Sequence, residues 1–142
     1  MTYATQQDLL DAFGASELLN QTDIDPTPTG AIVTARVDRA IAAAAGEVEG
    51  YLAARYQVPL ASVPANVKQA VCDIARYRLY RDNAPELVVE NYKAAIRLCR
   101  DISTGAVRLP LPTGNEPERT ESLVDFAGGQ HVFARESLRG CE

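Results

Sequence analysis

Apolar residues recur every three or four positions along three segments of the chain, which is the spacing of an α-helix with one buried face. The longest segment covers residues 31–56 and the second covers residues 64–82. The third starts after Asn83, with Pro85 in its first turn, and ends at Gly105, a residue that readily adopts the left-handed conformation that ends a helix. Eight positions are expected to meet in one core: Val37, Ile41, Val48, Leu52, Val71, Ile74, Tyr92 and Ile102. The pattern therefore predicts three long helices that share a core.

Two short helices are predicted ahead of the long ones. Thr5 and Asp8 have the spacing of a capping box, and Gly14 is placed to end the helix that they begin. Residues 16–20 open with another capping residue and predict a second short helix, whereas residues 22–30 are rich in turn formers. The expected fold is all-α: a small helical bundle of two short N-terminal helices and three longer helices, formed by residues 1–105.

Some positions within the long helices need a separate explanation. Gly46 and Gly50 each cost about 1 kcal/mol relative to alanine in a helix, and either the close approach of another helix or a local irregularity accounts for them. Asn83 and Glu86 have the spacing of a second capping box, which predicts the start of the third long helix. Arg78 falls on the buried side of its helix by spacing alone.

The chain changes character after Gly105. Residues 109–118 are polar and spaced by prolines, which favours an extended conformation. Apolar residues return near the end of the chain, interleaved with two arginines: Val132, Phe133, Arg135, Leu138 and Arg139. Because a tail with apolar side chains at its end tends to dock on a surface, we predict that residues 106–142 form an extended C-terminal arm. Through these five residues we expect the arm to contact a neighbouring subunit or another protein that lies next to it.

The charges are unevenly distributed along the 142 residues. Residues 1–63 carry eight acids and three bases, residues 64–109 carry five acids and eight bases, and residues 110–142 carry six acids and three bases. A basic middle between two acidic parts suits complementary surfaces on neighbouring subunits, although solvated helix faces explain it without any partner. The length itself is that of one domain with one core.

The sequence predicts neither a membrane segment nor a metal site. No run approaches the roughly 20 apolar residues of a membrane-spanning helix, and the N-terminus lacks the basic and apolar regions of a signal peptide. Cys72, Cys99 and Cys141 have neither disulfide nor zinc-site spacing, and His131 is the one histidine. We expect synthesis in a cytoplasm, free thiols and no metal.

Catalytic motifs are absent from the sequence. It contains no phosphate-binding loop, nucleophile elbow or zinc-protease motif. Any histidine-based catalysis would have to use His131, which follows a glycine pair and has no evident orienting partner. A surface residue of the arm is the simpler interpretation of this histidine. We therefore expect no enzymatic activity, no catalytic residues and no cofactor.

The second long helix carries a run of bases and aromatics, a composition typical of nucleic-acid-binding surfaces: Arg76, Tyr77, Arg78, Tyr80 and Arg81. The helical spacing favours another interpretation, in which the tyrosines lie at the edge of the core and the arginines are their solvated neighbours. The acidic isoelectric point of about 4.9 also argues against DNA binding. A small helical DNA-binding or regulatory protein is the alternative function that this run leaves open.

Three segments resemble the head-to-tail connector proteins of Mu-like phages and prophages. They are Tyr51-Leu52-Ala53-Ala54-Arg55-Tyr56 with the following Val58-Pro59-Leu60, the segment from Pro64 to Tyr80, and the segment from Tyr92 to Leu109. In the last of these a helix stops at Ser103-Thr104-Gly105. Residues 3–9 and 133–140 are similar to the usual start and end of that family, whereas residues 110–130 match weakly.

The resemblance implies a structural virion protein with no catalytic residues, an adaptor between head and tail. Such a bundle would assemble as a ring below the portal protein and dock the next tail-side connector protein. Packaged DNA would pass through the ring without sequence-specific binding. The implied location is the virion, at the head-tail junction, after synthesis in the cytoplasm of the bacterial host.

Overall fold

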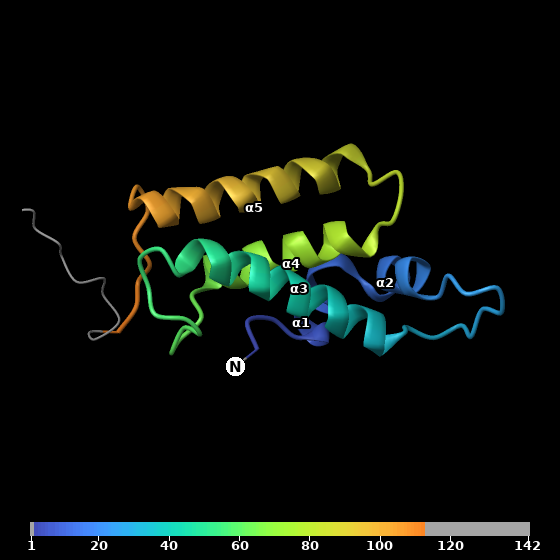
Figure 1. Cartoon of the computed structure of the whole chain (residues 1–142). Helices are drawn as coiled ribbons and strands as arrows, with labels where there is room; N and C mark the ends of the chain where they lie inside the picture. Colours follow the sequence, from blue (N-terminus) through green and yellow to red (C-terminus); the bar gives the residue numbers. More distant parts are fainter. Residues whose placement is uncertain (1, 113–142) are drawn as a thin grey trace, which may run out of the picture.

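The computed structural model describes residues 2–112, which form five α-helices and no strand (Figure 1). The helices are α1 (Gln6–Phe13), α2 (Ala15–Thr22), α3 (Thr34–Leu52), α4 (Ala65–Leu79) and α5 (Glu86–Thr104). The three long helices pack on one another, and the short helices α1 and α2 lie against α3 and α4 on the side away from α5. The predicted all-α fold, with two short and three long helices, is confirmed for the described residues.

Helix α3 is shorter at both ends than the apolar pattern predicts. Val33 has an extended backbone (φ -81°, ψ 93°) and precedes the helix, which ends at Leu52 rather than at Tyr56. Residues 53–56 continue as turns, in which the Tyr56 N–H donates to the Leu52 carbonyl oxygen at 2.8 Å. Tyr56 is nevertheless buried. The apolar period continued past the helix because these flanking residues also reach the core.

The link between α4 and α5 also differs from the prediction. Helix α4 ends at Leu79, three residues early, because the backbone of Tyr80 is extended (φ -75°, ψ 119°). Asn83 is not a helix cap: it has a left-handed φ of 56°, which asparagine tolerates better than most residues. Pro85 occupies the N-cap of α5, without a side-chain cap. The predicted capping box of Asn83 and Glu86 is therefore wrong.

The predicted caps at Thr5, Gly14 and Gly105 are confirmed, whereas Ser16 is not a cap, because it lies inside α2 and Gly14 is the N-cap of that helix. The Thr5 N–H donates to a carboxylate oxygen of Asp8 at 2.8 Å, and the Asp8 N–H donates to Thr5 Oγ1 at 3.3 Å, which completes the capping box. The Thr5 hydroxyl also donates to the Asp8 carboxylate at 2.8 Å, and this bond, followed by that from the Thr5 N–H, lowers the pKa of Asp8. Gly14 ends α1 at φ 88° and Gly105 ends α5 in the left-handed region at φ 85°. Glycine adopts these angles without the Cβ strain of other residues.

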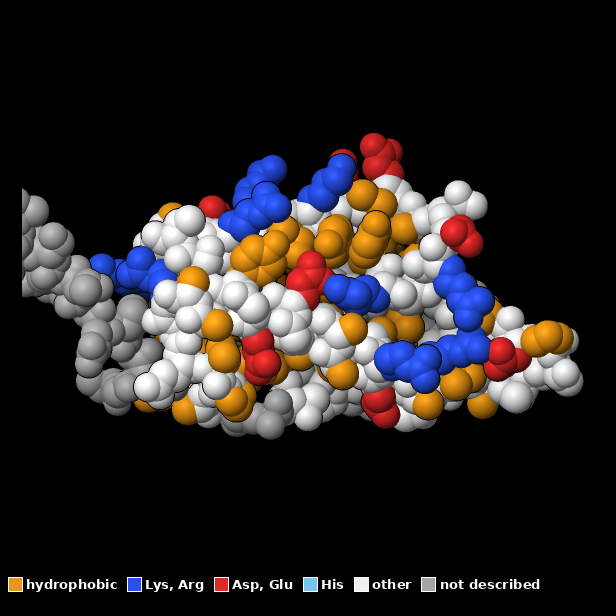
Figure 2. Space-filling view, in the orientation of Figure 1, with side chains coloured by type: hydrophobic (Ala, Val, Ile, Leu, Met, Phe, Trp, Pro, Cys, Tyr) orange, Lys and Arg blue, Asp and Glu red, His pale blue; other side chains and the backbone are white. Residues whose placement is uncertain are grey.

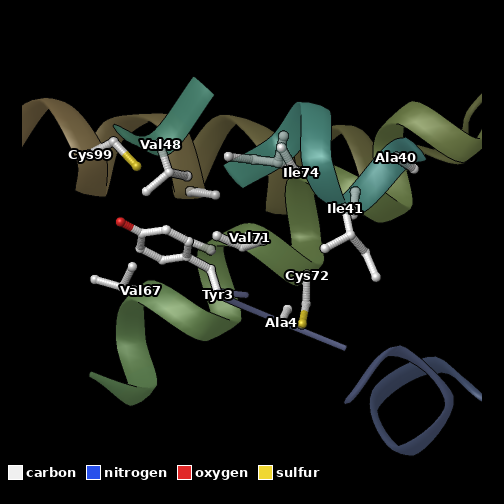
Figure 3. Close-up of a cluster of buried hydrophobic side chains, with 14 of the residues drawn as sticks. Tyr3, Ala4, Ala40, Ile41, Val48, Val67, Val71, Cys72, Ile74 and Cys99 are labelled. Carbon is white, nitrogen blue, oxygen red and sulfur yellow. The ribbon is translucent and has the colours of Figure 1, made fainter. Parts of the chain in front are cut away.

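Helix α4 lies at the centre of the core and is buried around most of its circumference. Helix α3 covers one side and α5 a second, while α1 and the segment before it cover a third. Figure 3 shows Tyr3 lying close to Val67 and Val71 of α4, with Ala4 beside Cys72. The buried residues of α4 are Val67, Ala70, Val71, Cys72, Ile74, Ala75 and Leu79. Seven of the eight predicted core residues are buried, and Tyr92 packs against them half-buried.

Two buried tyrosines attach non-helical segments to the bundle. Tyr3 Oη accepts a hydrogen bond from the Leu60 N–H at 3.0 Å, and Tyr56 Oη accepts one from the Leu109 N–H at 3.1 Å. Leu109 belongs to the core, and Leu111 packs against it. The chain thus continues to contribute to the core beyond Gly105, and the predicted division at residue 105 stays a prediction for residues 113–142, which lie outside the described part.

Residues 23–33 form the loop between α2 and α3, where the turn formers of residues 22–30 predicted one. The buried Thr22 Oγ1 donates to the Leu18 carbonyl oxygen at 2.7 Å and accepts from the Val33 N–H at 3.1 Å, which joins the two ends of the loop. Asp23 accepts from the N–H groups of Thr29 and Gly30 at 3.0 and 2.8 Å, and these bonds lower its pKa. The loop is therefore held by its own polar groups.

Gly46 and Gly50 lie on the exposed side of α3, where an added Cβ at either position would meet no atom within 4 Å. The close approach of another helix within the described residues is therefore not the reason for either glycine. We predict that Gly46→Ala and Gly50→Ala each raise the free energy of unfolding by about 0.5–1 kcal/mol, because alanine loses less backbone entropy in a helix. Urea denaturation with an unchanged m-value would measure this gain.

Gly105→Ala is the matched control for these variants. Its φ of 85° strains any other residue, and an added Cβ would collide with the guanidinium group of Arg55. This substitution should lower the free energy of unfolding. A loss of stability at position 46 or 50 as well would show that these glycines meet a neighbour in solution.

A second prediction concerns the core between α3 and α4. Leu52 and Ile74 are fully buried, so that Leu52→Ala and Ile74→Ala should each lower the free energy of unfolding by about 2–5 kcal/mol through lost burial and a cavity. Leu87, which is 61% exposed, provides the control, since Leu87→Ala should change it by less than about 0.5 kcal/mol. Chemical denaturation measures all three, and losses below 1 kcal/mol at both buried sites would contradict the core assignment.

Candidate interaction surface

The five predicted contact residues of the arm, Val132, Phe133, Arg135, Leu138 and Arg139, lie outside the described residues, as do His131 and Cys141. The functional surface is therefore sought on residues 2–112. Two features of that part bear on function. One is the run of bases and aromatics near the end of α4, and the other is a pocket lined by arginines.

Arg76 and Tyr80 are held by an acid from α2. Arg76 Nε and Nη2 donate to the two carboxylate oxygens of Glu17 at 2.5 and 2.8 Å, and Tyr80 Oη donates to the same carboxylate at 3.1 Å. The guanidinium carbon of Arg76 also lies 4.4 Å from the centre of the Phe13 ring. A bidentate, partly buried ion pair of this kind fixes the orientation of both partners. It joins α2 and the end of α1 to α4.

The pKa values of these groups reflect the same contacts. The hydrogen bonds to Glu17 raise the pKa of Arg76, and burial, followed by the negative charge of Glu17, raises the pKa of Tyr80. Arg76 therefore stays charged and Tyr80 stays a neutral donor throughout the physiological pH range. The charges of Arg76 and Tyr80 therefore do not change in this range, and their contact with Glu17 is structural.

Tyr77 and Arg78 join α4 to the other long helices. The ring of Tyr77 stacks on Tyr92 of α5, with centres 4.2 Å apart and planes inclined by 15°. Glu47 of α3 accepts from Arg78 Nη2 at 2.6 Å and from Tyr92 Oη at 3.2 Å. Burial and then the charge of Glu47 raise the pKa of Tyr92. Arg78 is an exposed residue of this network, so that its predicted place on the buried side is wrong.

These contacts use most of the run that has the composition of a nucleic-acid-binding surface. Arg76 and Arg78 are paired with acids, and the tyrosines lie at the edge of the core, as the helical spacing indicates. Arg81 is exposed and forms no ion pair within residues 2–112. Arg76 and Arg78 are thus paired with acids of other helices, which disfavours this run as a DNA-binding surface.

A pocket of about 270 Å³ lies where the loop after α2, the first half of α3 and the end of α4 meet. We call it the arginine pocket. It is lined by Arg36, Arg39, Arg78 and Arg81, by the apolar side chains of Ile24, Ala40, Ala43 and Leu79, and by Gln21. Figure 2 shows basic side chains gathered at the end of the molecule where this loop lies.

Sequence reasoning did not find this pocket. Its arginines lie far apart in the sequence: Arg36 and Arg39 belong to α3, Arg78 to the last turn of α4, and Arg81 follows that helix. Their proximity follows from the packing of α3 against α4. The available signal was local, since Arg36 and Arg39 have the i, i+3 spacing that places both on one helix face.

Two of the three cysteines lie in the core. Cys72 and Cys99 are buried free thiols, and burial raises the pKa of each to about 11. They are protonated at neutral pH and act as small apolar side chains. Within residues 2–112 no three His, Cys, Asp or Glu side chains are grouped so as to hold a metal ion. No helix in the same range is long and apolar enough to cross a membrane.

Comparison with known proteins places this chain in a phage family. Residues 3–127, which include all five helices, match the family described as "Bacteriophage Mu, Gp36". The chain belongs to the bacteriophage Mu Gp36 family. The expectation of a Mu-like phage protein is thereby confirmed.

Two relatives in this family are similar over most of their length. The "Mu-like prophage FluMu protein gp36" of Haemophilus influenzae is 30% identical over 106 residues, which cover 75% of each chain. "Gene product J" of Escherichia phage Mu is 30% identical over 140 residues, which cover 95% of this chain and 96% of the relative. Because the second similarity covers 95% of this chain, it includes most of residues 113–142, so the family resemblance is not confined to the bundle.

The ion pair of Glu17 and Arg76 provides a third prediction. Both side chains are mostly buried, with 22% and 16% of their surface exposed. Glu17→Gln should lower the free energy of unfolding by about 1–3 kcal/mol, because it leaves the charge of Arg76 partly buried without its partner. Lys68→Gln, which breaks the more exposed pair with Asp8, should cost less than about 1 kcal/mol. Equal losses in urea denaturation would mean that the Glu17 pair is no more important than a surface pair.

Proposed function

We propose that this chain is a structural connector of the virion, which assembles as a ring below the portal protein and docks the next tail-side protein. The family match over residues 3–127 carries the proposal, because a connector role is what the resemblance of the helical segments and their order implies. The absence of any enzymatic role is part of the same proposal. So is a location at the head-tail junction after synthesis in the host cytoplasm.

The bundle supports this proposal by the way in which it uses its polar groups. The described ion pairs hold helices or loops together: Asp8 with Lys68, Glu17 with Arg76, Asp25 with Arg36, and Glu47 with Arg78. These eight charged side chains are therefore used to hold the fold together. A small, cross-linked bundle with a long C-terminal segment is well suited to stacking in a ring.

The proposal also covers the DNA that leaves the capsid. Packaged DNA would pass through the ring without sequence-specific contacts, and the pairing of Arg76 and Arg78 with acids supports this assignment over a DNA-binding role. As part of the connector, we expect the arm to contact a neighbouring subunit or the adjacent virion protein through the five apolar and basic residues near its end: Val132, Phe133, Arg135, Leu138 and Arg139.

The test is a phage or prophage in which this gene is deleted. Electron microscopy of its lysate should show heads and tails that are not joined, and adding the purified full chain should restore joined particles. A chain that ends at Pro112 keeps Leu109 and the described core, so that it should keep its helical circular dichroism and melting behaviour but fail to restore particles.

Two outcomes would contradict these expectations. Normal joined particles in the absence of the gene would exclude the connector role. Restoration by the chain that ends at Pro112 would leave that role intact and show that residues 113–142 are not the attachment arm. Circular dichroism of the same preparation separates both outcomes from a simple failure to fold.

A further inference from the structure

The arginine pocket holds more positive than negative charge. Arg36 Nη2 pairs with Asp25 and Arg78 Nη2 with Glu47, each at 2.6 Å. Arg39 and Arg81 form no ion pair with any residue in the range 2–112. In addition, Arg36 Nη1 is a buried atom without a hydrogen-bond partner among these residues. A buried donor of this kind is costly to leave unpaired.

The walls of the pocket combine these charges with apolar surface. Ile24 is 39% exposed at the rim, and Leu79 and Ala43 contribute carbon surface next to the guanidinium groups. Guanidinium groups bind carboxylates through two parallel hydrogen bonds, which gives such contacts both strength and geometry. A hollow with this lining fits a peptide that presents carboxylates together with apolar side chains better than it fits the evenly charged backbone of DNA.

Residues 116–126 of this chain have the required chemistry. They contain four acids and one base: Glu116, Glu118, Glu121, Asp125 and Arg119. Three apolar residues flank the last acid, since Leu123 and Val124 precede Asp125 and Phe126 follows it. The acids of residues 1–63 that form ion pairs are already matched within the bundle, whereas residues 110–142 carry six acids against three bases. Residues 110–142 therefore carry an excess of acids, the charge that complements the pocket.

The positions of the pocket and of the arm indicate which copy of the chain supplies the acids. The pocket lies along the first half of α3. The described chain ends at Pro112, shortly after Leu109, whose N–H donates to Tyr56 Oη just beyond the other end of α3. A helix of 19 residues is about 28 Å long. Figure 1 shows the loop after α2 and the last described residues at opposite ends of the molecule.

We propose that the arginine pocket binds the acidic segment 116–126 of a second copy of this chain. The site lies at one end of the subunit and its ligand starts from the other end, so the contact joins two different surfaces. Contacts of this heterologous kind continue from copy to copy until they close a ring. This inference rests on the proposed ring assembly, for which it supplies the contact between neighbouring subunits. Arg39 and Arg81 receive the carboxylates, and Ile24 and Leu79 receive the apolar side chains.

The first experiment measures binding of a fluorescent peptide of residues 113–130 to the full chain by anisotropy. Arg39→Glu with Arg81→Glu should weaken this binding at least tenfold. Arg97→Glu with Arg100→Glu, which reverses two exposed charges of α5 outside the pocket, should change it less than twofold. Equal binding by both double variants, or no binding to the unmodified chain, would overturn the proposal. Loss of binding to a DNA duplex instead of the peptide would assign the pocket to nucleic acid.

The second experiment tests whether the contact joins two copies. A chain with Glu116→Lys, Glu118→Lys and Glu121→Lys has an intact pocket and a reversed arm, whereas the Arg39→Glu and Arg81→Glu chain has the opposite defect. Each alone should sediment as a monomer, and their mixture should associate. If peptide binding is lost in the pocket variant but the mixture stays monomeric, the arm occupies its own pocket and the second copy is excluded.

These experiments are independent of the portal protein and of particle assembly. Restoration of joined particles by the unmodified chain, together with a failure of peptide binding, would therefore reject the pocket assignment alone. Circular dichroism of every variant identifies any loss of folding.

Discussion

The fold depends on the burial of α4 on three sides. One neighbouring helix cannot cover seven buried side chains of a 15-residue helix, so α3, α5 and the N-terminal segment each cover part of α4. Its small residues Ala70 and Ala75 sit among larger ones such as Val71 and Ile74, which allows neighbouring helices to approach. Fully burying side chains of this size stabilises the folded state by about 1.5–3 kcal/mol each, relative to leaving them exposed. The positions of the other helices follow from this requirement.

The charged groups arrange the outer elements around that central helix. In each of the three ion pairs that join two helices, α4 supplies the base: Lys68 pairs with α1, Arg76 with α2 and Arg78 with α3. The acidic first part and the basic middle of the sequence are therefore complementary within one chain. The sequence left two interpretations of the charge pattern: complementary surfaces on neighbouring subunits, or solvated helix faces. Neither interpretation describes the six residues of these three ion pairs. They neutralise one another across helix interfaces, where partial burial limits screening by salt.

The helices and most of their ends could be predicted from the sequence because they depend on local chemistry. The apolar period gave the three long helices, and Thr5 with Asp8, Gly14 and Gly105 marked ends that the backbone geometry confirms. Asn83 misled because asparagine serves equally well as a cap and in a left-handed turn, and only the path between α4 and α5 decides between them. The Glu17 and Arg76 pair spans 59 positions, so that no local pattern could reveal it.

The same distinction between local and tertiary information explains the arginine pocket. Each arginine appeared in the sequence as one more base on a helix, and only Arg78 and Arg81 had an expected position, at a buried and a solvated face. Packing α3 against α4 brings Arg36 and Arg39 to Arg78 and Arg81, and among the described residues two acids pair with this group, Asp25 of the loop and Glu47 of α3. Four guanidinium groups around one hollow repel one another, and their mutual repulsion falls when carboxylates enter it. The tertiary structure therefore gathers a positive charge that no local pattern of the sequence shows, and the complementary excess of acids lies in residues 110–142, with six acids against three bases.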